Sequence, residues 1–383
     1  MSTAGRRALL AHTLLLQAVV FVLRPAATYQ ALRLDVSDAW IGALGAGFAL
    51  VPLLVAVRVG RAVDRAGERV IMIGGAALVV AAAVVFVLLS HQLAGLCLAV
   101  VLLGTGHLLA TVGQHSAVAN SSAREDMDRS FGRYTFMVSL GQAVGPALIL
   151  LTDGSSAIPD TGAIFVVGLA GSVLCLLVTL LTRSGPQRTR ASRDARAGTA
   201  WAQLRTPGVR AALVISTVVV AAIDILVVYL PVVAAGRGVS AGAVGLLLSC
   251  RAGAAMLTRL GLGALARVTT RSQLLVASVA AIGLGFVLLA LPLPLGWAFA
   301  GVALVGFGTG ASQPLTLAWV AAATAEGFRG RMMSLRLTGN RLGQVLLPAS
   351  GGLLVAGAGS AAVLWATALL VVAMGPAARM APP

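Results

Sequence analysis

The chain has 383 residues, of which 58% are apolar and 10% charged, and its mean hydropathy is +0.96. Soluble globular proteins carry about 45–50% apolar and about 25% charged residues. The composition therefore excludes an ordinary soluble enzyme, a disordered chain and a nucleic-acid-binding domain. The formal net charge of +16 would suggest nucleic acid in a soluble chain. Here we expect it to reflect arginines around membrane spans, in an all-α polytopic membrane protein that contacts the lipid bilayer.

Apolar runs long enough to cross a bilayer recur along the whole sequence. A hydrocarbon core of about 30 Å needs about 20 apolar residues in a helix. Arg6 and Arg7 before the first run mimic a signal peptide, but the runs continue to Met374, so we interpret the first as a span. Twelve spans are predicted, at 9–30, 39–59, 70–90, 93–118, 132–152, 161–182, 209–232, 239–259, 272–292, 295–322, 331–355 and 359–376.

A polar, arginine-rich stretch divides these spans into two groups of six. We predict an N-terminal six-helix bundle at residues 1–182, a basic cytoplasmic linker at 183–207 and a C-terminal six-helix bundle at 208–383. The three cysteines lie in apolar runs without metal-ligand spacing, so neither a metal nor another cofactor is expected.

The positions of the arginines set the expected orientation. If the N-terminus is cytoplasmic, 22 of the 28 basic residues fall in inside segments and only Arg33 and Arg237 fall outside. Positive residues favour cytoplasmic loops, so we predict that both termini are cytoplasmic. We expect a monomer in a bacterial cytoplasmic membrane.

Sequence motifs repeat between the two halves. The segment from Gly141 to Pro146 matches the segment from Gly343 to Pro348 at an offset of 202, and Arg65 and Arg69 match Arg267 and Arg271 at the same offset. The repeat favours a duplicated six-helix unit. Parallel six-helix halves with a substrate site between them are typical of secondary transporters.

The loop after the second span has the pattern G-x-x-x-D-R-x-G-x-R. Its five specified positions are Gly60, Asp64, Arg65, Gly67 and Arg69. In this loop the chain resembles the major facilitator superfamily, and the resemblance extends to the number of spans, the repeat and the central basic loop. It implies that the loop is a conformational switch that latches the two halves, although the arginines could instead only enforce topology. The corresponding loop of the second half has Ala266 where the aspartate would lie.

The fifth span carries glycines at spacings that allow close helix packing. Gly132, Gly141, Gly145 and Pro146 form the pattern G-x8-G-x3-G-P. This resembles the superfamily's antiporter motif, which implies export, but Ile149 and Leu150 replace the two glycines that complete it. The alternative is a kinked packing helix.

Ionisable groups inside spans are costly and usually face a partner or a cavity. Asp224 is the carboxylate placed deep in a span, and Arg251 lies at similar depth on the next one. The two could form a permanent ion pair. Alternatively, Asp224 could alternate between a proton and its charge partner during transport. His107 is a second proton-coupling candidate, with a structural hydrogen-bonding role as its alternative.

Surplus intramembrane arginines need counter-ions, which could be carbonyl groups or an anionic substrate. Arg336 could also anchor the end of its helix by snorkelling. The candidates for lining a substrate cavity are Arg24, Tyr29, Gln114, Arg251, Gln313, Asn340 and Arg341.

The sequence thus predicts a secondary transporter of a small organic molecule that works by alternating access. Proton-coupled efflux is favoured by the antiporter-like span and Asp224. The alternative is uptake or exchange of an organic anion through intramembrane arginines. A membrane-embedded enzyme or sensor is a third possibility that no motif favours, and no nucleotide-binding loop is present to drive an ATP-dependent pump.

Overall fold

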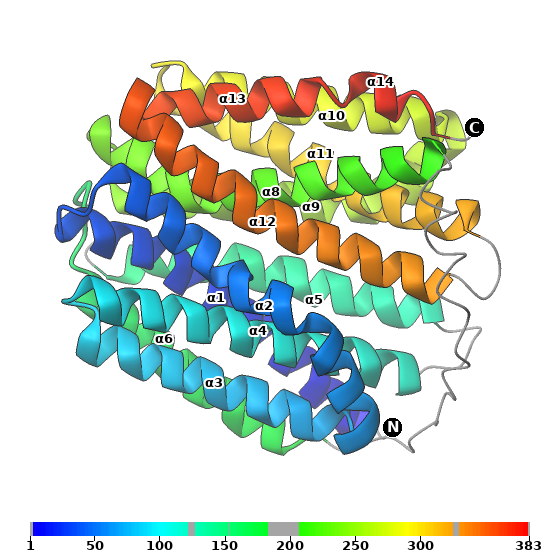
Figure 1. Ribbon diagram of the computed structural model, residues 1–383, viewed down its shortest axis with the longest axis horizontal. Coiled ribbons are helices and arrows are strands. Elements are labelled where there is room, and N and C mark those ends of the chain that lie inside the picture. Colours follow the sequence, from blue (N-terminus) through cyan, green and yellow to red (C-terminus); the bar gives the residue numbers. More distant parts are fainter. Residues whose placement is uncertain (1–2, 122–126, 153, 183–206, 325–328, 382–383) are drawn as a thin grey trace. The chain divides into compact units, whose positions relative to one another are not determined.

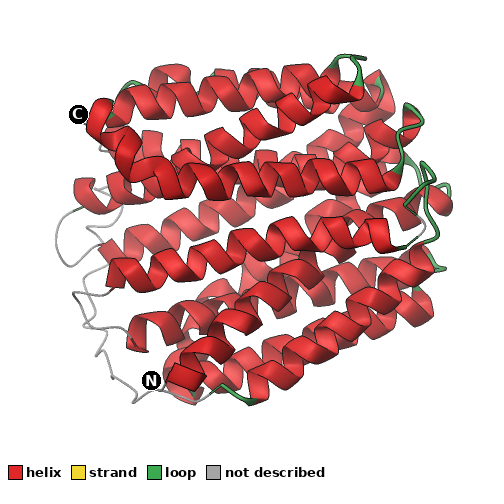
Figure 2. Cartoon of the chain, turned by 180° about the vertical axis from the view of Figure 1, so that it is seen from behind, coloured by secondary structure: helices red, strands yellow, loops and turns green. Residues whose placement is uncertain are grey.

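A computed structural model describes residues 3–121, 127–152, 154–182, 207–324 and 329–381. Within these ranges the chain is helical and contains no strand (Figure 2). The predicted linker at 183–207 lies, apart from Pro207, outside the described residues. The helices are α1 (Thr3–Arg33), α2 (Asp38–Ala66), α3 (Glu68–Leu89), α4 (Leu93–Ser121), α5 (Met127–Ala147), η1 (Leu148–Leu151), α6 (Thr161–Leu180), α8 (Pro207–Gly236), α9 (Ala241–Val268), α10 (Arg271–Ala290), α11 (Leu295–Ala323), α12 (Arg329–Ala358), α13 (Ser360–Val372) and α14 (Gly375–Ala378).

Eleven segments of the described chain are long and apolar enough to cross a membrane. The other long helix is α12, which has 30 residues and carries four arginines. The all-α prediction is therefore confirmed, and the helices follow the order of the twelve predicted spans, eleven of which meet the apolar criterion. Both α2 and α9 continue past the predicted spans, because hydropathy detects only the apolar part of a helix while arginine is also a good helix former.

Local signals explain several helix ends. The Asp160 side chain accepts a hydrogen bond from the backbone N–H of Gly162 and so caps the start of α6. Thr270 and Gln273 form a capping box at the start of α10. One residue after Pro146, α5 gives way to the 3₁₀ turn η1. Residue pattern and cap chemistry thus set the boundaries together.

The chain divides into two compact units. Unit 1 contains α1 to α6 together with Leu230–Ser249. Unit 2 contains α8 up to Tyr229, α9 from Cys250, and α10 to α14. In unit 1, α3 packs against both α4 and α6, and in unit 2, α10 packs against both α11 and α13 (Figure 1). The same helix neighbours therefore occur in both units, shifted along the sequence.

Close glycine contacts repeat at the same offset as the sequence motifs. A Cβ atom on Gly104 would clash with the carbonyl oxygen of Phe48, and one on Gly306 would clash with that of Arg251. The first pair lies in unit 1 and the second in unit 2, 202 to 203 residues later. Each glycine lets two helix backbones approach closely. The predicted duplication is thus also present in the packing of each unit.

Candidate functional site

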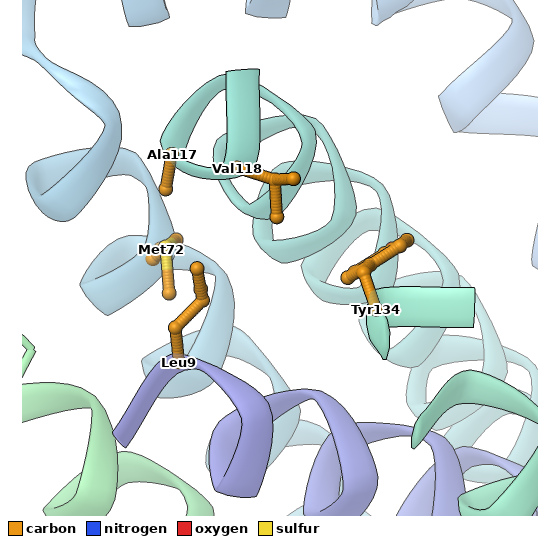
Figure 3. Close-up of a cluster of buried hydrophobic side chains, with 5 residues drawn as sticks. All are labelled: Leu9, Met72, Ala117, Val118 and Tyr134. Carbon is orange, nitrogen blue, oxygen red and sulfur yellow. The ribbon is translucent and has the colours of Figure 1, made fainter. Parts of the chain in front are cut away.

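A buried polar network joins three helices of unit 1. His12 of α1 and Gln114 of α4 are fully buried, and Gln114 Nε2 lies 2.9 Å from His12 Nδ1. The Tyr134 hydroxyl of α5 donates to Gln114 Oε1 at 3.1 Å. Gln114, a predicted cavity residue, therefore has both ends of its amide engaged within unit 1. Beside the network Tyr134 joins an apolar cluster (Figure 3) formed with Leu9, Met72, Ala117 and Val118.

Two predicted residues of unit 1 meet at the aromatic ring of Phe48 on α2. The Arg24 guanidinium lies 4.2 Å from the centre of this ring, and the His107 ring centre lies 5.6 Å from it. His107 Nε2 also lies 3.2 Å from Gln17 Nε2 of α1. Tyr29 is fully buried, and its hydroxyl has no hydrogen-bond partner among the described residues. Phe48 therefore brings the arginine of α1 and the histidine of α4 to one place.

Unit 2 buries an acid and a base on successive helices. Asp224 of α8 and Arg251 of α9 are each 2% exposed. Their charges interact, and Arg259, two turns further along α9, adds a second positive charge to the field at Arg251. A buried charge is stable only when it is paired or hydrogen-bonded. The arrangement suits a permanent ion pair or a pair that opens during transport, so both alternatives stay open.

Three predicted residues of unit 2 lie at the contacts of α12. Arg336 is 8% exposed and its Nη2 donates to the Gln313 side chain on α11 at 3.0 Å. Asn340 accepts a hydrogen bond from the Ser216 hydroxyl of α8 at 3.0 Å. Arg341 instead donates to Gln344 on its own helix at 3.1 Å. Arg336 therefore turns inward onto α11 and does not reach toward the helix end.

The predicted switch loop is a one-residue junction between α2 and α3. Gly67 has φ +86° and ψ 153°, a conformation that is accessible essentially only to glycine. Arg69 Nη2 donates to the carbonyl oxygen of Leu180 at the end of α6 at 3.0 Å. Gly60 has open space around it and Arg65 is exposed. The side chain of Asp64 lies outside the described residues.

The glycines of α5 divide into two kinds. A Cβ on Gly141 or Gly145 would clash with backbone carbonyl oxygens of α1, whereas Gly132 has nothing within 4 Å. Close packing therefore uses two of the three motif glycines. The end of α5 also contacts the start of α9 within unit 1, where the Ser249 hydroxyl donates to the carbonyl oxygen of Ala143 at 2.6 Å.

Sequence reasoning missed three buried polar residues of unit 1. His12 and Tyr134 complete the network around Gln114, and Glu68 is only 4% exposed in the first turn of α3. A histidine within an apolar run is a signal that could have singled out His12. Tyr134 carries no such signal, because tyrosine is common at the ends of spans.

Comparisons with known proteins agree with this architecture. The Major Facilitator Superfamily matches residues 9–302 and, in a second match, residues 212–383. A search of curated protein sequences returned no match. A variant of the nucleoside transporter NupG superposes with a TM-score of 0.81 at 15% identity, with 98% of each chain covered.

Two further solved structures are similar in fold. A bacterial homolog of the human lysosomal transporter Spinster gives a TM-score of 0.77 at 17% identity, covering 100% of this chain and 98% of its own. A POT family transporter in complex with 5-aminolevulinic acid gives 0.80 at 13% identity, covering 97% and 94%. Identities this low show the fold and not the substrate. The family match and these neighbours indicate a transporter and not an enzyme. The chain belongs to the Major Facilitator Superfamily and is a multi-pass membrane transporter.

Proposed function

We propose that the protein is a proton-coupled exporter of a small organic molecule. The observation that carries this proposal is the buried Asp224, whose charge interacts with that of Arg251. A carboxylate excluded from water can take up a proton when its charge partner moves away. Release of that proton when the pair re-forms would couple proton movement to substrate movement in the opposite direction.

In this proposal the two predicted six-helix bundles, residues 1–182 and 208–383, rock about a midplane site and are joined by the linker at 183–207. Both termini lie in the cytoplasm of a bacterial cell and the protein acts as a monomer. The antiporter-like residues of α5 favour export. Gly141 and Gly145 would provide the rigid contact between α1 and α5 that lets the N-terminal bundle move as one body.

The loop between α2 and α3 would be the conformational switch. Gly67 fixes a sharp junction that only glycine tolerates, and Arg69 ties the loop to the end of α6. Arg65 is exposed and so remains available for contacts that form in only one transport state. We expect Asp64 to be the acceptor for such contacts, as the resemblance to the superfamily implies.

The test is proton-driven flux in proteoliposomes made with the full chain. A ligand is first found by thermal stabilisation of the detergent-purified protein, using small carboxylates, phosphates, lipophilic cations and neutral antibiotics. Asp224→Asn should then reduce flux under a pH gradient to the level of protein-free liposomes while ligand binding is retained. Asp160→Asn makes the same chemical change at an exposed carboxylate and should transport normally. Unchanged flux in Asp224→Asn refutes the proton role.

A second candidate function is transport of an organic anion by uptake or exchange. Buried arginines favour it, because Arg24, Arg251 and Arg336 are each less than a tenth exposed. The charge of the stabilising ligand separates the two candidates. Stabilisation by anions that is lost in Arg251→Ala or Arg341→Ala would favour the anion transporter.

A further inference from the structure

The guanidinium of Arg336 is buried against neutral groups. Its Nη2 donates to the Gln313 carbonyl oxygen at 3.3 Å, to Gln313 Oε1 at 3.0 Å and to the Thr316 hydroxyl at 3.3 Å. Arg336 lies seven residues into α12, about 10 Å from its start, and is 8% exposed. These three acceptors orient the side chain but carry no negative charge.

No carboxylate balances this charge within the described part of the chain. An ion pair in that part of the chain joins Arg33 to Asp160 in unit 1, and Asp224 interacts with Arg251. Burial of an isolated charge is strongly unfavourable, and neutral hydrogen bonds compensate only part of the loss of hydration. Unlike Arg251, which interacts with Asp224, Arg336 therefore has a permanent positive charge for which the described residues supply no counter-ion.

Buried donors with no partner in the described chain lie on this guanidinium and on two adjacent residues of α11. Arg336 Nε, Gln313 Nε2 and Ser312 Oγ are all buried and have no hydrogen-bond partner among the described residues. Since Arg336 occupies Gln313 Oε1, the free end of that amide can only donate. Thr316 follows Ser312 by four residues and Gln313 by three, so helical spacing places its side chain beside both on α11. The cluster thus offers several donors and one positive charge.

A carboxylate or phosphate group fits this donor set best. Such a group can accept a charge-assisted hydrogen bond from the unused Arg336 Nε, and bonds of this kind are stronger than neutral ones. It can also accept bonds from the amide of Gln313 and the hydroxyl of Ser312. A neutral carbonyl ligand would use the donors but would leave the charge uncompensated.

We propose that Arg336, Gln313 and Ser312 form a binding site in unit 2 for the carboxylate or phosphate group of a small solute. Identification of that solute as a transported substrate rests on the proposed transport function, whereas the binding itself does not. The sequence predicted Gln313 but not Arg336 as a cavity residue, and the arginines it proposed for anion binding, Arg251 and Arg341, instead interact with Asp224 and Gln344.

The test measures thermal stabilisation of the detergent-purified full chain at constant ionic strength. The probes are acetate, benzoate, inorganic phosphate and phenyl phosphate, with benzamide as the neutral match for benzoate. At least one anion should stabilise the wild type while benzamide should not. Arg336→Gln should weaken that binding roughly 10- to 150-fold, as expected for loss of hydrogen bonds to a charged group. Arg379→Gln makes the same change at an exposed arginine and should bind normally.

A second variant keeps the test valid if Arg336→Gln does not fold. Gln313→Glu is nearly isosteric and supplies the missing negative charge beside Arg336. It should raise the thermal midpoint of the ligand-free protein and abolish stabilisation by anions. Gln313→Met removes the amide without adding charge and should not raise the midpoint.

Several results would overturn the site. These are stabilisation by benzamide equal to that by benzoate, no stabilisation by any anion up to millimolar concentrations, or anion binding by Gln313→Glu equal to that of wild type. Stabilisation by phosphatidylglycerol alone would assign the cluster to a lipid headgroup and would also overturn it. Anion binding without flux in proteoliposomes would support the site and count against the proposed transport. Flux of a neutral substrate without anion binding would support the proposed transport and overturn the site.

Discussion

The contact between α1 and α5 can be tested with two glycines of one helix. Gly141 and Gly132 both lie in the interior of α5, and replacement by alanine adds one methyl group at either position. At Gly132 that methyl group meets open space. At Gly141 it would lie 2.7 Å from Gln17 Cβ and would clash with the carbonyl oxygen of Leu14.

The structure gives the size of the expected difference. Ordinary van der Waals contact begins at 3.4 Å, so α1 and α5 must separate by at least about 0.7 Å to admit the Gly141→Ala methyl group at Gln17, and by more at the Leu14 carbonyl oxygen, which is closer. Overpacking of this kind costs about 1–3 kcal/mol. Both variants gain the same helix propensity, about 1 kcal/mol relative to glycine. Their difference therefore isolates packing, and Gly141→Ala should be less stable than Gly132→Ala by about 1–3 kcal/mol.

Thermal denaturation of the two purified variants and the wild type is the assay. Gly132→Ala should denature at or slightly above the wild-type temperature, and Gly141→Ala should denature several degrees below Gly132→Ala. Because Gln17 lies 3.2 Å from His107, displacement of α1 should also disturb the contact between α1 and α4. Equal midpoints for the two variants, or a lower midpoint for Gly132→Ala, would refute the packing argument.

Three further predictions concern single residues. The hydrogen bond from Arg33 holds the pKa of Asp160 below its usual range, so the pair stabilises the fold above about pH 4 and loses this effect as pH falls through the lowered pKa. The exposed pair contributes about 0.2–1 kcal/mol to stability. Asp160→Asn keeps the helix cap but removes the charge, so it should make the free energy of unfolding depend less on pH on the acid side. Parallel stability-against-pH curves for this variant and the wild type would contradict the prediction. Tyr134→Phe leaves its buried amide partner without a donor and should lower stability by about 1–3 kcal/mol in denaturation, whereas no change would mean that the bond is absent. Gly67→Ala forces alanine into a glycine conformation at a cost of about 1–3 kcal/mol, while Gly60→Ala, in open space inside α2, should leave the midpoint unchanged or raise it slightly; equal midpoints for the two variants would argue against strain.

Helix positions could be predicted from the sequence because the bilayer sets a minimum apolar length. The first span was predicted at 9–30 and the helix is Thr3–Arg33; the tenth was predicted at 295–322 and the helix is Leu295–Ala323. Arginines at the ends of helices lie outside the apolar run, so hydropathy underestimates helices such as α9. The bundle boundaries and the orientation of the termini remain predictions.

The candidate site was harder to predict because its contacts join different helices. Gln114 was predicted from its polarity, but its partners His12 and Tyr134 lie 102 and 20 residues away in the chain. A hydropathy pattern gives the depth of a residue in the membrane but not the helix that it faces. Arg336 illustrates this limit, since its position near a helix end suggested snorkelling whereas packing turns it onto α11.

Comparison of the two repeats shows what is unusual about Arg336. Tyr134 and Arg336 are 202 residues apart, as are Gln114 and Thr316, so one hydrogen bond occurs at the same place in each repeat. In unit 1 a neutral hydroxyl makes this bond to an amide that also reaches His12, and the network carries no permanent charge. In unit 2 the Arg336 guanidinium donates the corresponding hydrogen bond to the Thr316 hydroxyl. A hydrogen bond between two helices needs no charged donor, because the bond in unit 1 is made by a neutral hydroxyl. A neutral side chain in unit 2 would also avoid the free-energy penalty of burying a charge. The charge in unit 2 is therefore not explained by helix packing, and a bound anion supplies the counter-charge that the described residues of this unit do not.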